Sequence, residues 1–235
     1  MVYKWLKYIQ QKCLPHFCAI CLQQTHENRA ICYDCFNTLK YNNYSCKRCA
    51  IPLPASNAGM ICGDCLKKPP HFDQAIALFS YQTPVRQLIH GLKFNRKLAL
   101  ANLLGQLMAN YLNNRTGQQP DCIIPVPLSD KRLRQRGFNQ SIELARPVSR
   151  LLDIPVDRQL VYRVRDTDTQ TRLDLKARKI NVKNGFEVRK NEKYQYVVIL
   201  DDVMTTGATC NELARCLKNS GIKRVDIWCV ARAEK

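Results

Sequence analysis

Two adjacent carboxylates followed by a small, hydroxyl-rich turn are the strongest chemical signal in this sequence. Asp201 and Asp202 follow the apolar run 196–200, and a Thr- and Gly-rich turn precedes the next helical pattern. The first N–H groups of a helix lack intrahelical partners, and a glycine lets a phosphate approach them closely. Ionised carboxylates accept hydrogen bonds from a sugar diol or bind hydrated Mg²⁺. The order predicts a ribose-phosphate site, although an acidic pair can also simply end a strand.

The residues expected to act in this site follow from that chemistry. We expect Asp201 and Asp202 to be the catalytic carboxylates and to hold the ribose hydroxyls. The turn is expected to bind the 5′-phosphate through its backbone N–H groups and hydroxyls, and it consists of Thr205, Thr206, Gly207, Ala208 and Thr209.

A second stretch has the same order of features, but basic residues stand between its apolar run and its glycine. The apolar run 121–127 is followed by the basic segment 131–136, a glycine and the expected start of a helix near Asn139. Cations beside a helix N-terminus suit a pyrophosphate, so this stretch predicts a cradle for one. The alternative is a solvated basic loop.

Four C-x₂-C pairs lie between residues 18 and 65. Two such turns present four sulfurs to one tetrahedral ion, so eight cysteines predict two structural zinc sites. Disulfides are disfavoured by the cytosolic setting expected for the chain, whose N-terminus has no apolar signal core. Sequential pairing of the turns is favoured over cross-brace pairing. The expected ligands are Cys18, Cys21, Cys32 and Cys35, and then Cys46, Cys49, Cys62 and Cys65.

These residues must be positioned by an α/β fold. The strand 196–200, a helix ending near Gly221 and the strand 224–231 form a right-handed βαβ unit. Upstream, the pattern predicts strands over 74–81 and 121–127 and helices over 84–93 and 98–112. The segment 163–186 fits either a mobile loop beside an active site or an exposed hairpin. A break at Lys67–Pro70 divides the chain into a zinc ribbon domain, 1–70, and an α/β domain, 71–235.

The charge balance favours anionic partners. The 235 residues contain 37 Lys and Arg against 19 Asp and Glu, a net charge of +18. Such an excess attracts nucleic acid, anionic membrane or phosphorylated small molecules. Residues 1–12 predict an amphipathic helix that either packs on the zinc domain or binds a membrane surface or a partner. Four aromatic side chains are expected on the surface, where they could stack on single-stranded bases: Tyr41, Tyr44, Phe138 and Tyr162.

Several motifs together resemble the ComF/GntX family of phosphoribosyltransferase-like competence proteins, over nearly the whole chain. These motifs are the C-x₂-C pairs, IHGLKF at 89–94, PVPL at 125–128, RGFNQ at 136–140, Thr169-Gln170, Arg178 with Asn181, and ILDDVMTTGAT at 199–209. The resemblance implies a type I phosphoribosyltransferase fold, a mostly parallel sheet between helices, behind a small zinc ribbon domain. It also implies phosphoribosyl pyrophosphate (PRPP) with Mg²⁺ as ligand. The pyrophosphate loop would then carry Arg136, Gly137 and Asn139, and a flexible loop would carry Thr169, Gln170 and Arg178.

The same resemblance implies a role in natural transformation and DNA uptake. Single-stranded DNA would be handled on the cytosolic side, with a competence helicase or recombination proteins as partners and peripheral contact with the inner face of the membrane. The alternative is a catalytically active PRPP-dependent phosphoribosyltransferase that acts on a nucleobase or a related acceptor.

Overall fold

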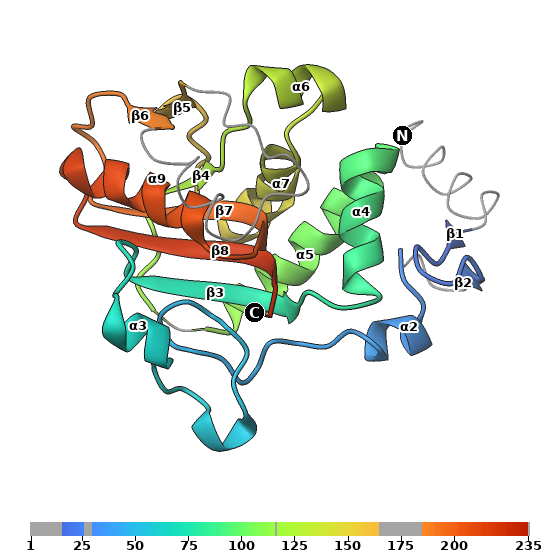
Figure 1. The fold of residues 1–235 in the computed structure, drawn as a ribbon. Coiled ribbons are helices and arrows are strands. Elements are labelled where there is room, and N and C mark those ends of the chain that lie inside the picture. Colours follow the sequence, from blue (N-terminus) through green and yellow to red (C-terminus); the bar gives the residue numbers. More distant parts are fainter. Residues whose placement is uncertain (1–15, 26–29, 116, 165–184, 235) are drawn as a thin grey trace.

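A four-stranded parallel sheet forms the centre of the protein (Figure 1). The computed structural model describes residues 16–25, 30–115, 117–164 and 185–234. The strand order is β3-β8-β7-β4, with β3 (Gln74–Ser80), β4 (Cys122–Pro125), β7 (Tyr196–Met204) and β8 (Arg224–Arg232). β7 and β8 are the inner pair, and the crossover between them contains the helix α9 (Ala208–Asn219).

Helices cover both faces of this sheet. Val197 and Ile199 of β7 pack in the apolar cluster that contains α9. Val198 and Leu200 face the opposite cluster, which contains α4 (Val85–Asn95), α5 (Ala99–Asn113) and α7 (Gln140–Leu152). Because neighbouring residues of a strand point to opposite faces, this continuous apolar run requires burial on both sides. The predicted α/β architecture with a mostly parallel sheet is therefore confirmed.

A glycine sets the spacing between α5 and α7. A Cβ atom on Gly105 would lie 2.3 Å from Cγ of Pro147 and 2.8 Å from the carbonyl oxygen of Leu144. Only a residue without a side chain permits this approach of the two helices. The contact fixes α7, whose N-terminal turn reaches the candidate site.

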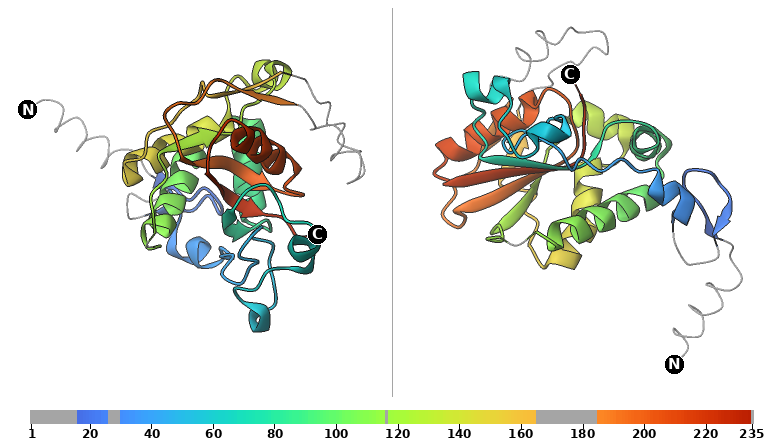
Figure 2. Two further views of the ribbon diagram at one scale, coloured as in Figure 1. Left: turned by 90° about the vertical axis from the view of Figure 1, so that its left-hand side faces the viewer. Right: turned by 90° about the horizontal axis from the view of Figure 1, so that it is seen from below.

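The cysteine-rich segment consists of two small units that lie against the α/β domain (Figure 2). The first contains β1 (His16–Phe17), β2 (Gln24–Thr25) and α2 (Tyr33–Asn37), and the second contains the 3₁₀ helix η1 (Ala55–Asn57) and α3 (Gly63–Lys67). The connecting chain covers the outer edge of β3. The N–H of Asn42 donates to Leu78, and the N–H of Ala75 donates to Arg48, at 3.0 and 2.9 Å. These bonds protect an edge strand that would otherwise present unpaired backbone groups.

Two expectations about local structure were wrong. β7 continues to Met204, so Asp201 and Asp202 belong to the strand and do not follow it. The basic segment 131–136 is not a polar loop, because it lies in the helix α6 (Asp130–Arg136), which Ser129 caps by accepting a hydrogen bond from the N–H of Arg132. Charged residues on a short solvent-exposed helix have no apolar period, which is why this pattern was not recognised as helical.

Two further expectations fall wholly or partly outside the described residues. The helix expected over 1–12 lies outside the described residues, and so does the part of the expected loop that carries Thr169, Gln170 and Arg178. The flanks of that second segment form an antiparallel pair, β5 (Val161–Arg163) and β6 (Phe186–Val188). Within the described ranges, every helix is too short or too polar to cross a membrane.

Candidate functional site

The two carboxylates lie near the carboxyl end of β7, as expected for a ligand site in a parallel sheet. Asp201 accepts hydrogen bonds from the hydroxyl of Ser141, at 3.2 Å, and from the N–H of Asp202, at 2.9 Å. Asp202 is buried, and its Oδ1 accepts from the N–H of Val203 at 2.8 Å. Each side chain is therefore held in one orientation by its surroundings.

Lys93 forms an ion pair with the second carboxylate. Its Nζ lies 2.5 Å from Oδ2 of Asp202, and the side chains of Lys93 and Asp202 are 19% and 4% exposed. Apart from this ammonium, Oδ2 has no hydrogen-bond partner among the described residues. Lys93 comes from the last turn of α4, more than 100 residues earlier in the chain. A ligand that binds Asp202 must share this oxygen with Lys93 or displace it.

The turn after β7 places a left-handed glycine at the start of α9. Gly207 has a φ of +75° and precedes the first turn of α9. That value lies in the left-handed region, which glycine adopts at little cost. Thr206 Oγ1 accepts a hydrogen bond from the N–H of Ala208 at 3.3 Å, while Thr205 is exposed. Thr209 lies half-buried in the first turn of α9, so the five predicted residues surround one helix N-terminus.

A buried arginine connects this turn to the second cysteine unit. Arg232, at the end of β8, donates to the carbonyl oxygens of Met204, at 2.9 Å, and of Thr205. It also donates to the carbonyl oxygen of Cys49 at 3.0 Å. The guanidinium of Arg232 thus bonds backbone oxygens of the turn and of a predicted zinc ligand, and this fixes the position of the turn relative to the second cysteine unit.

The loop that precedes α7 lies next to the carboxylates. Asn139 caps α7 by accepting from the N–H of Ser141 at 2.9 Å, and its amide donates to the carbonyl of Val126 at 3.0 Å. Arg136 is half-buried and donates to Gln140 at 2.8 Å. Gly137 ends α6 with a φ of +79°. Ser141, in the first turn of α7, thus connects this region to Asp201. The charge of Arg136 interacts with the charges of both carboxylates.

Burial and mutual repulsion alter ionisation in this cluster. Burial, together with the neighbouring charge of Asp202, raises the pKa of Asp201 to about 7. Burial lowers the pKa of Arg136, although the two carboxylates oppose that effect. A cationic ligand group or a hydrated metal ion would relieve the repulsion between the two acids. Oxygen donors of this kind fit Mg²⁺, the ion expected with PRPP.

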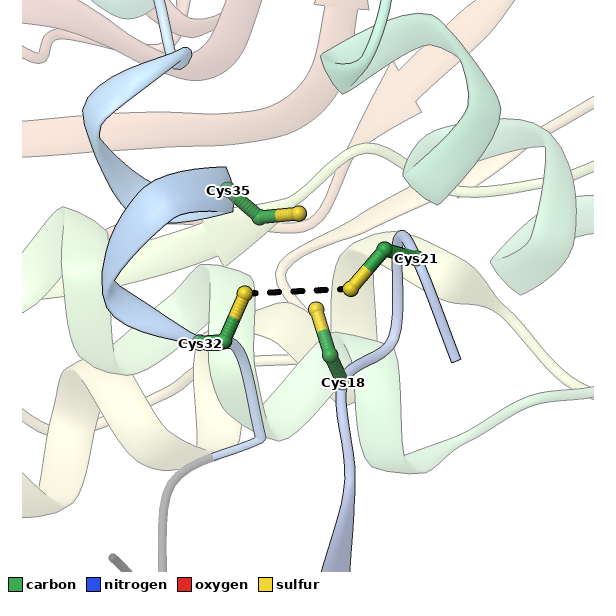
Figure 3. A group of neighbouring side chains, drawn as sticks. All are labelled: Cys18, Cys21, Cys32 and Cys35. Atoms are coloured by element: carbon green, nitrogen blue, oxygen red, sulfur yellow. Dashed lines mark hydrogen bonds between the residues drawn. The ribbon is translucent and has the colours of Figure 1, made fainter. Parts of the chain in front are cut away.

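The eight paired cysteines form two compact groups. Cys18, Cys21, Cys32 and Cys35 point toward a common centre (Figure 3), and Cys46, Cys49, Cys62 and Cys65 form the second group. Within each group the sulfur atoms lie within 4.8 Å of one another. This confirms sequential pairing and excludes the cross-brace alternative. Four convergent thiols, with no further ligand in either group among the described residues, match a closed structural zinc site.

The environment of the thiols supports metal binding. Burial opposes the ionisation of Cys46, but N–H groups that include those of Cys62 and Arg48 lower its pKa to about 7. Cys18 is affected in the same way, and its pKa is lowered to about 6. Burial and the neighbouring thiols raise the pKa of Cys35 and of Cys65. Four thiolates therefore need a cation at their centre, which Zn²⁺ supplies.

Sequence reasoning missed three residues of this region and misplaced two aromatic side chains. Lys93, Ser141 and Arg232 come from distant segments and carry no local pattern that marks their roles. Lys93 alone lay within a recognised motif, IHGLKF. Tyr41 and Phe138 are not surface aromatics, because both are partly buried against the apolar core, whereas Tyr44 and Tyr162 are exposed.

Comparison with known proteins agrees with this architecture. Residues 9–66 match the double zinc ribbon domain, and residues 93–235 match the phosphoribosyl transferase domain. The chain is 37% identical over 224 residues to the DNA utilization protein YhgH of Shigella flexneri, covering 93% of this chain and 98% of that protein. It is 36% identical over 226 residues to competence protein F of Haemophilus influenzae, covering 92% and 96%. Identity to competence protein ComFC of Bacillus subtilis is 24% over 202 residues, covering 81% and 79%.

The fold and the cysteine groups define a protein with a phosphoribosyltransferase domain behind an N-terminal double zinc ribbon. Within that class, the chain belongs to the ComF family, whose members include competence protein F, ComFC and YhgH. The resemblance read from the motifs is thereby confirmed.

Proposed function

We propose that this protein binds PRPP with Mg²⁺ at the carboxyl edge of the sheet and binds single-stranded DNA in a DNA-utilization pathway of the cytosol. The observation that carries the PRPP proposal is the position of Asp201 and Asp202 at the end of β7, shortly before a left-handed Gly207 at a helix start. A sugar diol needs acceptors and a phosphate needs N–H donors, and the two kinds of group are separated by only four residues of chain.

Each residue then has a definite task. Asp201 and Asp202 accept hydrogen bonds from the ribose hydroxyls, and residues 205–209 bind the 5′-phosphate. Mg²⁺, when bound, would neutralise charge on the pyrophosphate. Arg136 and Gly137 provide a cation and an accessible backbone for the pyrophosphate, while Asn139 holds the loop in place. Lys93 balances the charge of Asp202 before the ligand arrives.

Calorimetric titration with PRPP and Mg²⁺ tests this site directly. We expect Asp202→Ala to weaken PRPP binding at least tenfold, because hydrogen bonds to a charged acceptor contribute about 1.5–3 kcal/mol. The matched control is Glu192→Gln, since Glu192 is an exposed carboxylate whose ion-pair partner is Lys190. Equal binding by wild type and Asp202→Ala would refute the assignment of the diol site.

The DNA proposal is supported by charge and by the relatives. The net charge is +18, and proteins named for DNA utilization and competence align over almost the full chain. Single-strand affinity should fall with salt, with a log–log slope of about −0.7 for each phosphate neutralised. A slope near zero would exclude any substantial contact with phosphates.

The alternative is an active phosphoribosyltransferase. The same carboxylates and cations would then stabilise an oxocarbenium-like transition state while pyrophosphate leaves. Release of pyrophosphate from PRPP in the presence of each common nucleobase would support this function. An unchanged PRPP concentration in all reactions would leave the site as a binding or sensing site.

A further inference from the structure

An exposed aromatic side chain contacts Arg136, next to the candidate site, and has no task in the proposed PRPP site. Phe94 follows Lys93, the ion-pair partner of Asp202, in the last turn of α4. Its residue surface is 60% exposed. A phenylalanine in this position adds little to the core, so its stability contribution does not explain it.

Two neighbours hold the ring of Phe94 in place. The ring of His90, one helical turn earlier, lies with its centroid 4.6 Å away. The guanidinium of Arg136 lies 5.4 Å from the centroid, at the distance of a cation–π contact. Arg136 is itself fixed by its hydrogen bond to Gln140. The aromatic surface is therefore prearranged rather than free to move with a flexible side chain.

The surroundings of the ring are basic. Arg96 and Lys97 lie two and three residues after Phe94 and are exposed, and the segment 85–98 contains no acidic residue. The guanidinium of Arg96 extends toward the loop before α7, within 3.8 Å of where a Cβ on Gly137 would lie. The helix α6, whose Arg136 contacts the ring, contains four basic residues and one carboxylate. An aromatic face with a cationic rim suits a ligand that has both flat bases and phosphates.

We propose that Phe94 is a stacking platform for one nucleobase of a single-stranded DNA, with Arg96 and Lys97 binding the adjoining phosphates. The inference rests on the DNA-binding part of the proposed function and gives it a location. Stacking on aromatic rings accepts any base because every base has a π-face, and cations along the strand add affinity that depends on salt. A duplex hides the faces of its bases, so the platform selects single strands.

Fluorescence anisotropy with a labelled 15-nucleotide oligothymidine separates the two contributions. We expect Phe94→Ala to weaken binding about tenfold with an unchanged salt slope, and Phe94→Trp to restore it. The double variant Arg96→Gln/Lys97→Gln should instead make the slope shallower by about 1.4, which is the value for two phosphates. Tyr33→Ala is the control, because Tyr33 is an exposed aromatic residue of the ribbon that has no assigned role in DNA binding.

Each outcome bears on the proposal. Equal affinity of Phe94→Ala and wild type would overturn it, as would an equal loss in Tyr33→Ala or equal affinity of wild type for a duplex of the same length. PRPP affinity of Phe94→Ala should match that of wild type, and a parallel loss of PRPP binding would show that the platform is not a separate site. If wild type itself binds no oligothymidine, the DNA part of the proposed function fails together with the platform, whereas PRPP binding is unaffected.

Discussion

The ion pair between Lys93 and Asp202 offers a test of the site that needs no ligand. Nζ and Oδ2 are 2.5 Å apart, and the two side chains are 19% and 4% exposed. At an effective dielectric constant of about 20 the attraction is on the order of 6–7 kcal/mol, but desolvation of both charges offsets much of it. Removing one partner of a buried pair typically costs about 3–5 kcal/mol, because the other charge stays buried without compensation.

The unequal burial of the two partners predicts unequal costs. Lys93→Met leaves the Asp202 carboxylate buried with an oxygen that has no other hydrogen-bond partner in the described part of the chain, so we expect a loss of about 3–5 kcal/mol in the free energy of unfolding. Asp202→Asn leaves an ammonium that is one-fifth exposed and can reach water, so we expect only about 2 kcal/mol. The double variant should recover part of the loss, with a coupling energy of about 1–3 kcal/mol.

Chemical denaturation followed by circular dichroism measures these differences, with Zn²⁺ held in excess so that the ribbon stays folded. The exposed pair of Lys190 and Glu192 is the control, and its coupling should stay below about 1 kcal/mol. If Lys93→Met costs no more than Asp202→Asn, or if the two losses are additive, the reasoning from burial is wrong.

Three more predictions concern packing, ionisation and metal. Gly105→Ala should lower the free energy of unfolding by about 2 kcal/mol, because the added Cβ would clash with Pro147. Gly63→Ala is the control and should leave stability unchanged, because the space around its Cβ is open. Urea denaturation of both variants measures the difference. The pKa of Asp201 is raised from 3.8 to about 7, so its stabilising contribution is complete below pH 4 and is lost as pH rises to 7. Asp201→Asn should therefore show a flatter stability profile than wild type between pH 4 and 7, and identical slopes would contradict the assigned burial. Metal analysis should find two zinc ions per chain. Removal of zinc by a chelator should increase the rate of amide hydrogen exchange along the outer edge of β3, which the ribbon covers. An unchanged rate would show that the ribbon does not need metal to cover that edge.

The local elements were well predicted wherever a periodic apolar pattern was long enough. The strand that became β8 was expected over 224–231 and runs over Arg224–Arg232. The start of α7 was expected near Asn139, which caps it. The end of β7 was misjudged because two adjacent carboxylates resemble the polar end of a strand. In the folded chain they continue the ladder with β8, where Asp201 pairs with Cys229.

Charge-rich segments were the hardest to interpret. The helix α6 has six polar residues among seven, so hydrophobic periodicity gives no signal for it. Exposure of aromatic residues was equally difficult, since Tyr41 packs against Phe79 with ring centroids 4.9 Å apart. Whether an aromatic side chain is buried depends on the elements that pack around it.

The sequence by itself determined the two cysteine groups and predicted the ribose-phosphate site, because eight cysteines at C-x₂-C spacing and the carboxylate–threonine–glycine order are local patterns. It also determined the family and the parallel α/β fold, since buried strands that alternate with amphipathic helices leave few other arrangements. Only the tertiary structure decided which charges meet. Lys93 reaches Asp202, Ser141 reaches Asp201, and Arg232 joins the turn after β7 to the ribbon, because contacts between distant segments depend on how helices cross the sheet.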